Sequence, residues 1–495
     1  MKRAVTPRVF RGFQDLLPEQ MGARQRMIRT IQDVYESYGF LPLGTPAIEY
    51  LEVLTGTGGT EAQQSLFHVQ NPDMRGEETS PSDALALRFD LTVPLARVVS
   101  QYQELPRPFR RYQVAQVWRA DKPDRGRFRE FTQFDIDSVG VPSDLADTEI
   151  IAAMCDTLAA LGVQGYRVRF SSRAVLNLLL AFAEVPERWT VLDAKGRNVE
   201  FHGSDVFRVL DKLDKIGPER VRKELMAGYQ DDSGDTITGL GLSGSQVDRI
   251  EKFLSIHSED RQEVLARVGT LFHAVPNAAD ELAVLDRMSR RLATLGYGND
   301  RVAVDLSVAR GLAYYTGPVF EAILTDAPQF GSVFGGGRYD NLVLRFLGES
   351  LPATGASIGV DRLLAALIHI GQIELRRATA QVLVAVLDKN LLDDCLAMAF
   401  ELRRAGIRTE LYLGDKGIGR QLKYADAIQV PFVVLLGSDE HARGVVTVKR
   451  MSVGRATAAE VAERSQWLQE RAGQFEIPRD ELVTQLHGIL AAEGW

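Results

Sequence analysis

The chain has 495 residues, of which 45% are hydrophobic and 25% are charged, and its formal net charge is −8. These values are typical of a globular protein of about three domains, and they argue against a globally basic nucleic-acid protein while leaving room for a local basic patch. The two cysteines, Cys155 and Cys395, lie far apart in the sequence, which argues against a disulfide framework and favours the cytoplasm. No signal-peptide core and no apolar run of membrane-spanning length is present, so no membrane partner is expected.

The first third of the chain combines one long helix with many short strands. Apolar residues recur at helical spacing over 19–38 and predict a helix there. Strand patterns then dominate from about residue 64 to residue 140, with a short helix over 91–102 and a longer one beginning near Ser143. Irregular and helical segments separate these strands, which indicates an α+β domain with a mixed, largely antiparallel sheet.

The segment 118–137, WRADKPDRGRFREFTQFDID, carries the strongest functional signal in this region. Its Pro/Gly pair with flanking charge predicts the loop of a long hairpin. Alternation then places Gln133, Asp135 and Asp137 on one face of the second strand. Arginine forks suit phosphate and a carboxylate balances an amine, so the segment predicts a site for a polyphosphate beside an ammonium group. The alternative is a solvated, highly charged hairpin.

A helical block interrupts the strand-rich pattern. Helical stripes fill residues 172–298 and strand patterns nearly vanish there, so we expect a helical insertion. The sheet pattern resumes after it, and a helix follows over 360–370. The strand-rich domain is therefore expected in two parts, 1–171 and 299–372.

Two short peptides stand out in the second part. In ARGLAYYTG, Arg310 and two tyrosines, Tyr314 and Tyr315, lie between strand patterns. In FGGGRYD, three glycines precede Arg338 and Tyr339, and such a run favours close approach of the backbone to a ligand. A hairpin turn is the alternative for the glycines, and a surface salt bridge is the alternative for Arg310.

A third peptide, TGASIGVDRLLAAL, opens the helix over 360–370. Asp361 fits a helix cap at this position. Arg362 opposes the helix dipole, which a bound phosphate would explain. Without such a ligand, Arg362 is a solvated arginine.

The C-terminal part has a different pattern. After a polar stretch over 373–381, near-continuous apolar strands alternate with helices, which indicates a separate α/β domain over 379–470 with a buried, mainly parallel sheet. Residues 471–495 are expected to form an extension with an additional helix, whose role the sequence does not indicate.

Three basic residues of this domain, Lys416, Arg420 and Lys423, are spaced four and three apart and predict one basic helix face. Such a row could follow RNA phosphates, and a solvated helix face is the alternative. The domain carries as many acidic as basic residues, so its net charge favours neither.

Several common signatures are missing from the sequence. It has no GxxxxGK[ST] loop, no strand-linked GxGxxG and no HExxH, which argues against P-loop, Rossmann and zincin enzymes. The seven histidines show no metal-ligand spacing, so no metal site on the protein is expected.

In their order along the chain and in their residues, these segments resemble the histidyl-tRNA synthetase family of class II aminoacyl-tRNA synthetases. The resemblance covers the chain up to about residue 470. RVFRGFQDLLPEQ resembles the family's N-terminal signature, and TPAIEY resembles motif 1, which builds the family's dimer interface. Residues 118–137 resemble motif 2, and TGASIGVDRLL resembles motif 3. ARGLAYYTG and FGGGRYD resemble the two peptides that distinguish the histidine enzymes from other class II members.

The resemblance implies a triphosphate site built from arginines. Arg119 would contact the α-phosphate of ATP, Arg127 the distal phosphates, and Arg362 would complete the clamp. Arg310 would stabilise charge on the α-phosphate while the histidine carboxylate attacks it, which makes Arg310 and Arg119 the expected catalytic residues.

The resemblance also implies a histidine site. Asp90 and Thr92 would hold the α-amino group, and Gln133 would support the amino acid. Asp137 and Tyr315 would contact the imidazole. The remaining expected members of the histidine site are Arg310, Tyr314 and Tyr339. Mispaired polar groups would penalise isosteric amino acids in such a pocket.

Two positions depart from the family pattern. Ala313 stands where the pattern has Asp, and RFDLT replaces a Pro-Glu-Gly-Thr form, so that Asp90 keeps the carboxylate with a shorter reach. These departures leave details of histidine and tRNA handling open.

The implied function is a cytoplasmic, homodimeric histidine–tRNA ligase that uses ATP and Mg²⁺, with tRNA(His) bound through a C-terminal anticodon-binding domain. One alternative is a histidine-binding regulatory paralogue that controls ATP phosphoribosyltransferase. The full arginine set and the C-terminal domain argue against it. Another alternative is a class II enzyme for proline or threonine, which the two histidine peptides argue against.

Overall fold

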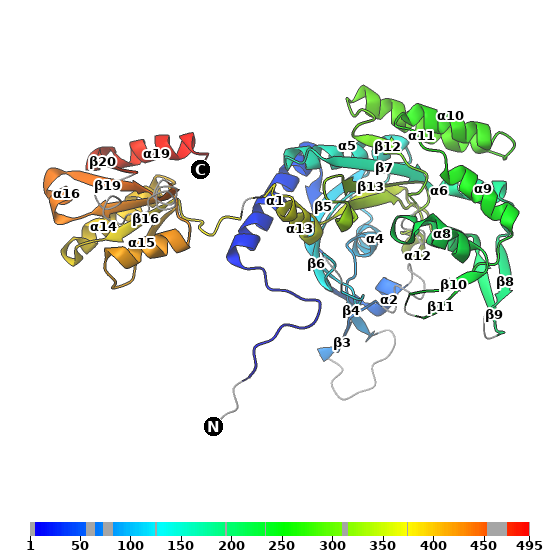
Figure 1. Cartoon of the computed structure of the whole chain (residues 1–495), viewed down its shortest axis with the longest axis horizontal. Helices are drawn as coiled ribbons and strands as arrows, with labels where there is room; N and C mark the ends of the chain where they lie inside the picture. Colours follow the sequence, from blue (N-terminus) through cyan, green and yellow to red (C-terminus); the bar gives the residue numbers. More distant parts are fainter. Residues whose placement is uncertain are drawn as a thin grey trace. The chain divides into compact units, whose positions relative to one another are not determined.

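The computed structural model describes residues 5–55, 65–72, 83–123, 126–193, 196–232, 234–308, 315–373, 375–452 and 473–494. The chain divides into two units, one formed by residues 1–15 with 24–373 and one by residues 16–23 with 374–495 (Figure 1). In the described part of the chain, no helix is both long and apolar enough to cross a membrane.

The first unit is built on an eight-stranded sheet in the order β1-β5-β6-β15-β14-β13-β7-β12. Its central strands are β5 (Phe109–Trp118), β6 (Glu130–Val139), β15 (Ala353–Gly359), β14 (Ser332–Arg338), β13 (Pro318–Leu324) and β7 (Tyr166–Ser172). Every pairing among these central strands is antiparallel. The edge strands β1 (Leu41–Pro42) and β12 (Val302–Val304) each run parallel to their neighbour. The predicted mixed, largely antiparallel sheet is confirmed.

The long hairpin predicted from the charged segment is the β5–β6 pair, which stays in register from Phe109↔Val139 to Trp118↔Glu130. One face of this hairpin is covered by helix α1 (Pro18–Ser37), where Tyr35 meets Phe134 edge-on with ring centroids 5.0 Å apart. Because side chains alternate along a strand, Gln133, Asp135 and Asp137 share the opposite face. That opposite face carries the candidate site.

Helix α5 (Asp144–Ala160) follows the hairpin and begins where the sequence predicts. Ser143 is its N-cap, and the hydroxyl oxygen accepts a hydrogen bond from the backbone N–H of Leu145 at 3.2 Å. Its apolar residues pack against the sheet, since Ile150, Met154 and Leu158 are fully buried.

A small three-stranded sheet lies beside the main one, in the order β2 (Ile48–Tyr50), β4 (Leu85–Leu87), β3 (His68–Val69). The chain then turns through Asp90 into helix α4 (Thr92–Gln101), the short helix predicted over 91–102. This turn places Asp90 and Thr92 next to the β5–β6 hairpin, because the backbone N–H of Trp118 donates to the carbonyl of Arg88 at 3.0 Å.

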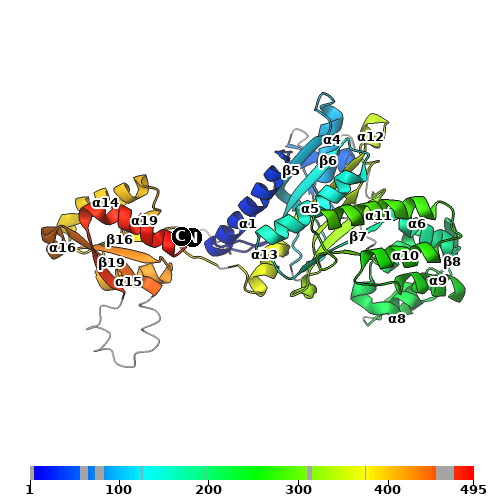
Figure 2. The same ribbon diagram turned by 90° about the horizontal axis from the view of Figure 1, so that it is seen from above.

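The block between β7 and β12 is mainly helical, and its helices gather at one end of the unit (Figure 2). They are α6 (Arg173–Phe182), α7 (Gly203–Leu210), α8 (Leu213–Leu225), α9 (Gly244–Leu254), α10 (Arg261–Leu271) and α11 (Ala278–Thr294). Two hairpins also occur here, β8 (Arg188–Leu192) with β9 (Asn198–His202) and β10 (Gly228–Gln230) with β11 (Thr236–Thr238).

The expectation that strands nearly vanish from this block is therefore wrong. The strands are short, and in β8 exposed residues alternate with the partly buried Trp189 and Val191. A two-stranded hairpin of this kind needs little apolar sequence, which leaves only a weak pattern.

The second unit contains a five-stranded sheet in the order β17-β16-β18-β19-β20. Its strands are β16 (Val382–Val386), β17 (Thr409–Leu411), β18 (Phe432–Leu436), β19 (Val445–Arg450) and β20 (Gln474–Pro478). Strand β16 runs parallel to β17 and β18, whereas β19 runs antiparallel to both of its neighbours. The expected mainly parallel sheet is thus a mixed one, because the chain returns after β18 through the short helix α16 (Ser438–Arg443).

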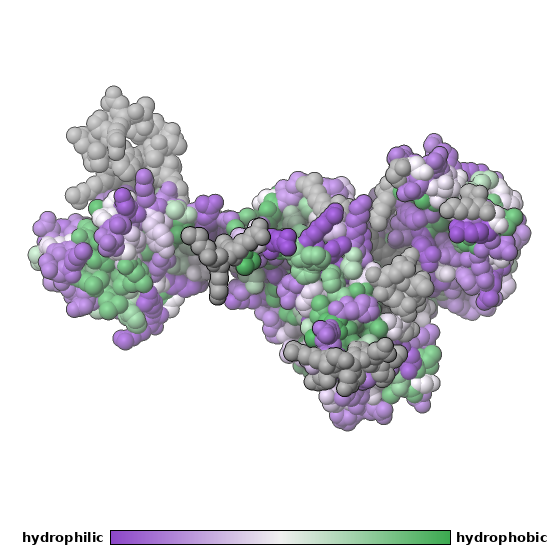
Figure 3. Space-filling view, turned by 90° about the horizontal axis from the view of Figure 1, so that it is seen from below, coloured by the Kyte–Doolittle hydropathy of each residue, from purple (hydrophilic) through white to green (hydrophobic). Residues whose placement is uncertain are grey.

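Residues expected to form a C-terminal extension belong to this same sheet and core. Strand β20 pairs with β19, and helix α19 (Leu482–Ala492) buries Leu482, Leu486 and Leu490 in the core that also holds Val446. The other helices of the unit are α14 (Leu392–Arg404) and α15 (Ile418–Ala427). Hydrophobic side chains gather on one face of this unit in the space-filling view (Figure 3).

Candidate active site

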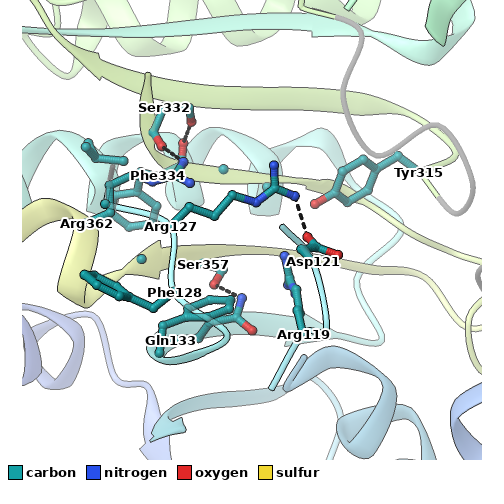
Figure 4. A pocket seen from close by; sticks show the side chains of 16 residues that line it. Arg119, Asp121, Arg127, Phe128, Gln133, Tyr315, Ser332, Phe334, Ser357 and Arg362 are labelled. Carbon is teal, nitrogen blue, oxygen red and sulfur yellow. Dashed lines mark hydrogen bonds and ion pairs between the residues drawn. The ribbon is translucent and has the colours of Figure 1, made fainter. Parts of the chain in front are cut away.

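A cavity of about 290 Å³ lies on the polar face of the main sheet, beneath the loop of the β5–β6 hairpin (Figure 4). Its walls come from this hairpin, from β14 and β15, and from helix α13 (Val360–His369). Arg119 and Arg127 of the hairpin and Arg362 of α13 all line it, although Arg362 lies far from the other two in the sequence. The structure thus brings together the three arginines expected at a triphosphate.

Arg119 is fixed by the structure around it. Its Nε donates to the carbonyl oxygen of Phe89 at 2.9 Å, and its guanidinium lies over the ring of Phe131, 5.1 Å from the centroid. A guanidinium held at its Nε and on one face keeps its remaining N–H groups directed to one place, which suits a phosphate oxygen.

Arg127 is held more loosely, in an ion pair with Asp121 in which the arginine side chain is 51% exposed. The hydroxyl of Ser65 donates to Asp121 at 2.8 Å. Burial opposes ionisation of Asp121, but the hydrogen bond from Ser65 and the pairing with Arg127 outweigh it, so the pKa of Asp121 is lowered. The pair is therefore ionised at neutral pH and open to solvent.

The start of α13 differs from the sequence expectation at Asp361. The helix has no side-chain cap, and Asp361 instead accepts a hydrogen bond from the backbone N–H of Thr132 at 2.6 Å. Its carboxylate also lies 3.5 Å from Nε of Arg24 on α1. Asp361 thus ties α13 to β6 and α1. Arg362, the next residue, donates to the carbonyl of Ser332 at 2.9 Å at the cavity wall.

The glycine run of FGGGRYD lies inside β14 and is not a turn, so the hairpin-turn alternative is wrong. A Cβ at Gly336 would lie 2.2 Å from the carbonyl oxygen of Gly355, and one at Gly337 would lie 2.9 Å from the ring of Tyr315. Gly335 and Gly336 line the cavity. Gly337 therefore leaves the space that the Tyr315 ring occupies against the sheet, with the Tyr315 hydroxyl directed toward the cavity (Figure 4).

Asp137 lies across the sheet from Gly337, since Gly355 of β15 is the register partner of both. It is almost fully buried and forms an ion pair with Arg111, with Nη2 2.8 Å from Oδ2. The hydroxyl of Tyr339 donates to the other carboxylate oxygen. Burial raises the pKa of Asp137, while Arg111 and the Tyr339 hydrogen bond oppose this rise.

Asp90 completes a second group of buried acids. Its carboxylate accepts a hydrogen bond from the backbone N–H of Val93 at 3.1 Å. Burial raises the pKa of Asp90 to about 6, although this hydrogen bond and the positive charges of Arg119 and Arg111 oppose the rise. Thr92, the first residue of α4, follows directly.

Gln133 stands between the two groups. Its amide donates to the hydroxyl of Ser357 at 2.7 Å, and it lines the cavity. Its carbonyl oxygen is buried and has no hydrogen-bond partner, so this acceptor is available to a ligand.

Comparison with known proteins identifies the family. The family model of histidyl-tRNA synthetase matches residues 12–195 and 187–363, and that of the anticodon binding domain matches residues 381–471. The histidine–tRNA ligase of Cereibacter sphaeroides is 43% identical over 503 residues, covering 99% of this chain and 98% of that protein. The chain belongs to the histidyl-tRNA synthetase family.

Other relatives agree with this assignment. The histidine–tRNA ligase of Roseobacter denitrificans is 41% identical and covers 99% of this chain and 98% of that protein. The crystal structure of histidyl-tRNA synthetase from Nostoc sp. PCC 7120 has a TM-score of 0.79 at 28% identity, covering 98% of this chain and 100% of the other. The predicted class II catalytic domain and C-terminal anticodon-binding domain are confirmed.

Some predicted site residues cannot be placed, and one basic residue lies differently from the prediction. Arg310, Tyr314 and Ala313 lie outside the described residues. In the synthetase's second unit, Arg420 and Lys423 lie on α15 and are exposed, whereas Lys416 precedes the helix. The predicted single helix face therefore contains only two of the three basic residues, since Gly417 is the N-cap of α15.

Sequence analysis assigned no role to Arg111, and it placed Asp135 on the face of the site without a specific role. Both are buried, at 0% and 2% exposure, and both are on the polar face of the hairpin. The available signal was alternation: Arg111 and Gln113 occupy alternate positions of a strand whose other residues are mainly apolar or aromatic. Within the described residues, no group of three or more His, Cys, Asp or Glu residues could hold a metal ion.

Proposed function

We propose that this chain is a histidine–tRNA ligase that activates histidine with ATP and passes the histidyl group to the 3′-terminal adenosine of tRNA(His). The observation that supports this most strongly is a site with two ends: a cavity lined by Arg119, Arg127 and Arg362, and the buried acids Asp90 and Asp137 beside it. A triphosphate suits the first end and a cationic amino acid suits the second.

ATP would occupy the arginine-lined end. Arg119, which is fixed by Phe89 and Phe131, would contact the α-phosphate. Arg127 would move from Asp121 to the distal phosphates, because an exposed ion pair costs little to break. Arg362 would complete the clamp from the start of α13.

Histidine would occupy the end of the site beside the buried acids. Asp90 and Thr92 would hold the α-amino group, and the unpartnered carbonyl oxygen of Gln133 would accept a further hydrogen bond from it. Asp137 and Tyr315 would contact the imidazole, with Tyr339 beside it and Tyr314 in the same site. Fixed acceptors in a buried pocket favour a ring that carries N–H groups over an apolar isostere.

The reaction needs charge stabilisation more than acid–base chemistry. A carboxylate oxygen of histidine attacks the α-phosphorus, the bond to the bridging oxygen breaks, and pyrophosphate leaves. Arg310 and Arg119 would stabilise the negative charge on the α-phosphate during this step. The adenosine hydroxyl then attacks the carbonyl carbon of histidyl-adenylate, and AMP leaves.

Magnesium would enter the cavity with ATP. Mg²⁺ is usually bound through substrate phosphates, waters and one or two carboxylates, so a preformed protein cage is not needed. Asp121, which lines the cavity, could supply one carboxylate once Arg127 has turned to the phosphates.

The proposal extends to a partner subunit, to the tRNA and to the location in the cell. Around motif 1, Leu41, Tyr50 and Tyr102 are 62%, 51% and 47% exposed, which suits a homodimer interface. In the second unit, Arg420, Lys423 and Lys416 would contact tRNA phosphates. A cytoplasmic location fits the two free, buried cysteines.

Amino-acid-dependent ATP–pyrophosphate exchange tests the proposal. We expect exchange with histidine and not with proline or threonine, and we expect Arg310→Ala to abolish it. Histidine binding without any exchange in the native protein would contradict the ligase function and favour a regulatory paralogue. Proline- or threonine-dependent exchange would indicate another class II specificity.

A further inference from the structure

Arg111 is the fully buried arginine of the histidine site, and the proposed function gives it no role. Its side chain is 0% exposed, and it is among the largest fully buried side chains of the chain. Burial of a guanidinium is costly unless charges and hydrogen bonds compensate it. A buried arginine at this place therefore needs a physical reason.

The geometry around Arg111 provides that reason. On β5 it is the register partner of Asp137 on β6, and its Nη2 lies 2.8 Å from Oδ2 of Asp137. The same nitrogen donates to the carbonyl oxygen of Leu91 at 3.0 Å. Leu91 is the residue between Asp90 and Thr92. One nitrogen thus joins the carboxylate proposed for the imidazole to the turn proposed for the α-amino group.

Asp135 adds a second carboxylate to this buried group. It follows Gln133 on the same strand face, is 2% exposed, and has one carboxylate oxygen with no hydrogen-bond partner. Burial raises the pKa of Asp135, Arg111 opposes the rise, and the negative charge of Asp137 adds to it. The other ionisable groups that interact with these two carboxylates are Asp90, Arg88, Tyr35 and Tyr339.

We propose that Arg111 is a positioning and specificity-determining residue that holds Asp137 and the Asp90–Thr92 turn in one arrangement, with Asp135 as the second carboxylate that shares its charge. This inference rests on the proposed function, in which Asp137 contacts the imidazole. Without Arg111, the buried carboxylates of Asp135 and Asp137 would lie side by side on one strand face, and one would keep a proton. Asp137 would then be a weaker hydrogen-bond acceptor because its negative charge is reduced. The Asp90–Thr92 turn would lose the hydrogen bond between Arg111 and the carbonyl oxygen of Leu91.

The first test is Arg111→Met in the full-length chain, measured by histidine-dependent ATP–pyrophosphate exchange. We expect KM for histidine to rise at least about tenfold while KM for ATP changes less than about threefold, because only the amino acid end is disturbed. Wild-type KM for histidine, or an equal rise in both constants, would overturn the inference.

The second test is rescue. The double variant Arg111→Met with Asp135→Asn removes one positive and one negative charge, so Asp137 faces no second carboxylate. We expect KM for histidine to return to within about threefold of wild type, which a merely structural role for Arg111 does not predict. A double variant with a higher KM for histidine than Arg111→Met would overturn the inference. Where the single variant does not fold, a double variant whose KM for histidine does not return to within about threefold of wild type would overturn it.

Arg261 on α10 provides a matched control. It is 3% exposed, donates to the carbonyl of Tyr297 at 2.9 Å, and shares with Arg111 an Nε and an Nη1 without hydrogen-bond partners. Arg261→Met should lower the melting temperature without changing KM for histidine. A native protein with no histidine-dependent exchange would contradict the proposed function itself, whereas native exchange with an unchanged Arg111→Met variant would contradict only this inference.

Discussion

The proposed ATP end and the proposed histidine end of the site each contain an arginine–aspartate pair, and the two pairs differ in their surroundings. Arg127 and Asp121 have side-chain exposures of 51% and 22%, whereas Arg111 and Asp137 have exposures of 0% and 3%. An exposed pair contributes about 0–1 kcal/mol, but loss of one partner of a buried pair costs about 3–5 kcal/mol. The same type of ion pair can therefore be an exchangeable contact at the proposed ATP end and a fixed part of the proposed histidine end.

The largest effect should come from loss of the buried ion pair between Arg111 and Asp137. In Asp137→Asn, the carboxylate that pairs with Arg111 disappears and the guanidinium stays buried without a counter-charge. We expect kcat/KM for histidine to fall by at least about 10³-fold in pyrophosphate exchange, in line with a cost of about 4 kcal/mol.

Glu321→Gln is the control for this prediction. Glu321 is equally buried in the same sheet and pairs with Arg169, and it is not among the residues proposed to contact histidine. It should lower stability while kcat/KM for histidine stays within about tenfold of wild type. Equal losses in the two variants would mean that burial, and not contact with histidine, explains the effect.

Arg119→Ala should have the next largest effect, and it should act on kcat. A fixed donor directed at a developing charge contributes about 10²–10³-fold in rate. Pre-steady-state formation of histidyl-adenylate would measure this loss directly. A variant that changed KM for ATP but not the rate of adenylate formation would assign Arg119 to ground-state binding alone.

Arg127→Ala should affect ATP binding and little else. Because its pair with Asp121 is exposed, we expect a rise of about tenfold in KM for ATP and a change in unfolding free energy of less than about 1 kcal/mol. Urea unfolding followed by fluorescence would measure the stability, and exchange at varied ATP would measure KM. A large loss of stability would mean that the pair is part of the fixed framework.

The histidine end should also show itself in the pH dependence of stability. Burial raises the pKa of Asp135 from its ordinary value near 4 to about 7, so the native state holds a proton that the unfolded state has lost between these values. The contribution of Asp135 to the free energy of unfolding should therefore fall as the pH rises from about 4 to about 7. Comparing urea unfolding of wild type and Asp135→Asn across this range would reveal the slope, and parallel curves would contradict it.

The smallest effects are expected in the second unit. Arg420→Ala and Lys423→Ala should each weaken tRNA binding a few-fold and reduce the slope of log K against log salt by about 1. Lys416→Ala should have a smaller effect, because Lys416 precedes α15 and pairs with Asp415 at 3.3 Å. Filter binding at several salt concentrations would measure all three, and unchanged slopes would leave α15 a solvated helix face.

The sequence predicted elements whose signal is local. The β5–β6 hairpin follows from a charged loop between alternating strands, and α1 and α5 follow from helical spacing and an N-cap serine. It missed elements that depend on partners far away in the chain. Strand β20 becomes visible only through its pairing with β19, and the hairpins of the helical block carry too few apolar residues to be distinctive.

The same distinction applies to the site. Arg119 and Arg127 lie in one recognisable segment, and Arg362 follows from its conflict with the helix dipole. Sequence analysis did not identify a role for Arg111, because its partner Asp137 lies on the next strand and Leu91 lies in a separate turn. Asp361 was taken for a cap because the sequence does not show that Thr132 and Arg24 approach it. Contacts across strands and between helices decide such roles.

The most direct test of the two-ended site is ATP–pyrophosphate exchange with Asp137→Asn and Arg127→Ala, titrating histidine at saturating ATP and then ATP at saturating histidine. We expect Asp137→Asn to raise KM for histidine and leave KM for ATP nearly unchanged, and we expect the reverse for Arg127→Ala. If both variants raised both constants to the same degree, the two ends would not have separate functions, and the assignment of histidine to the buried acids would be contradicted.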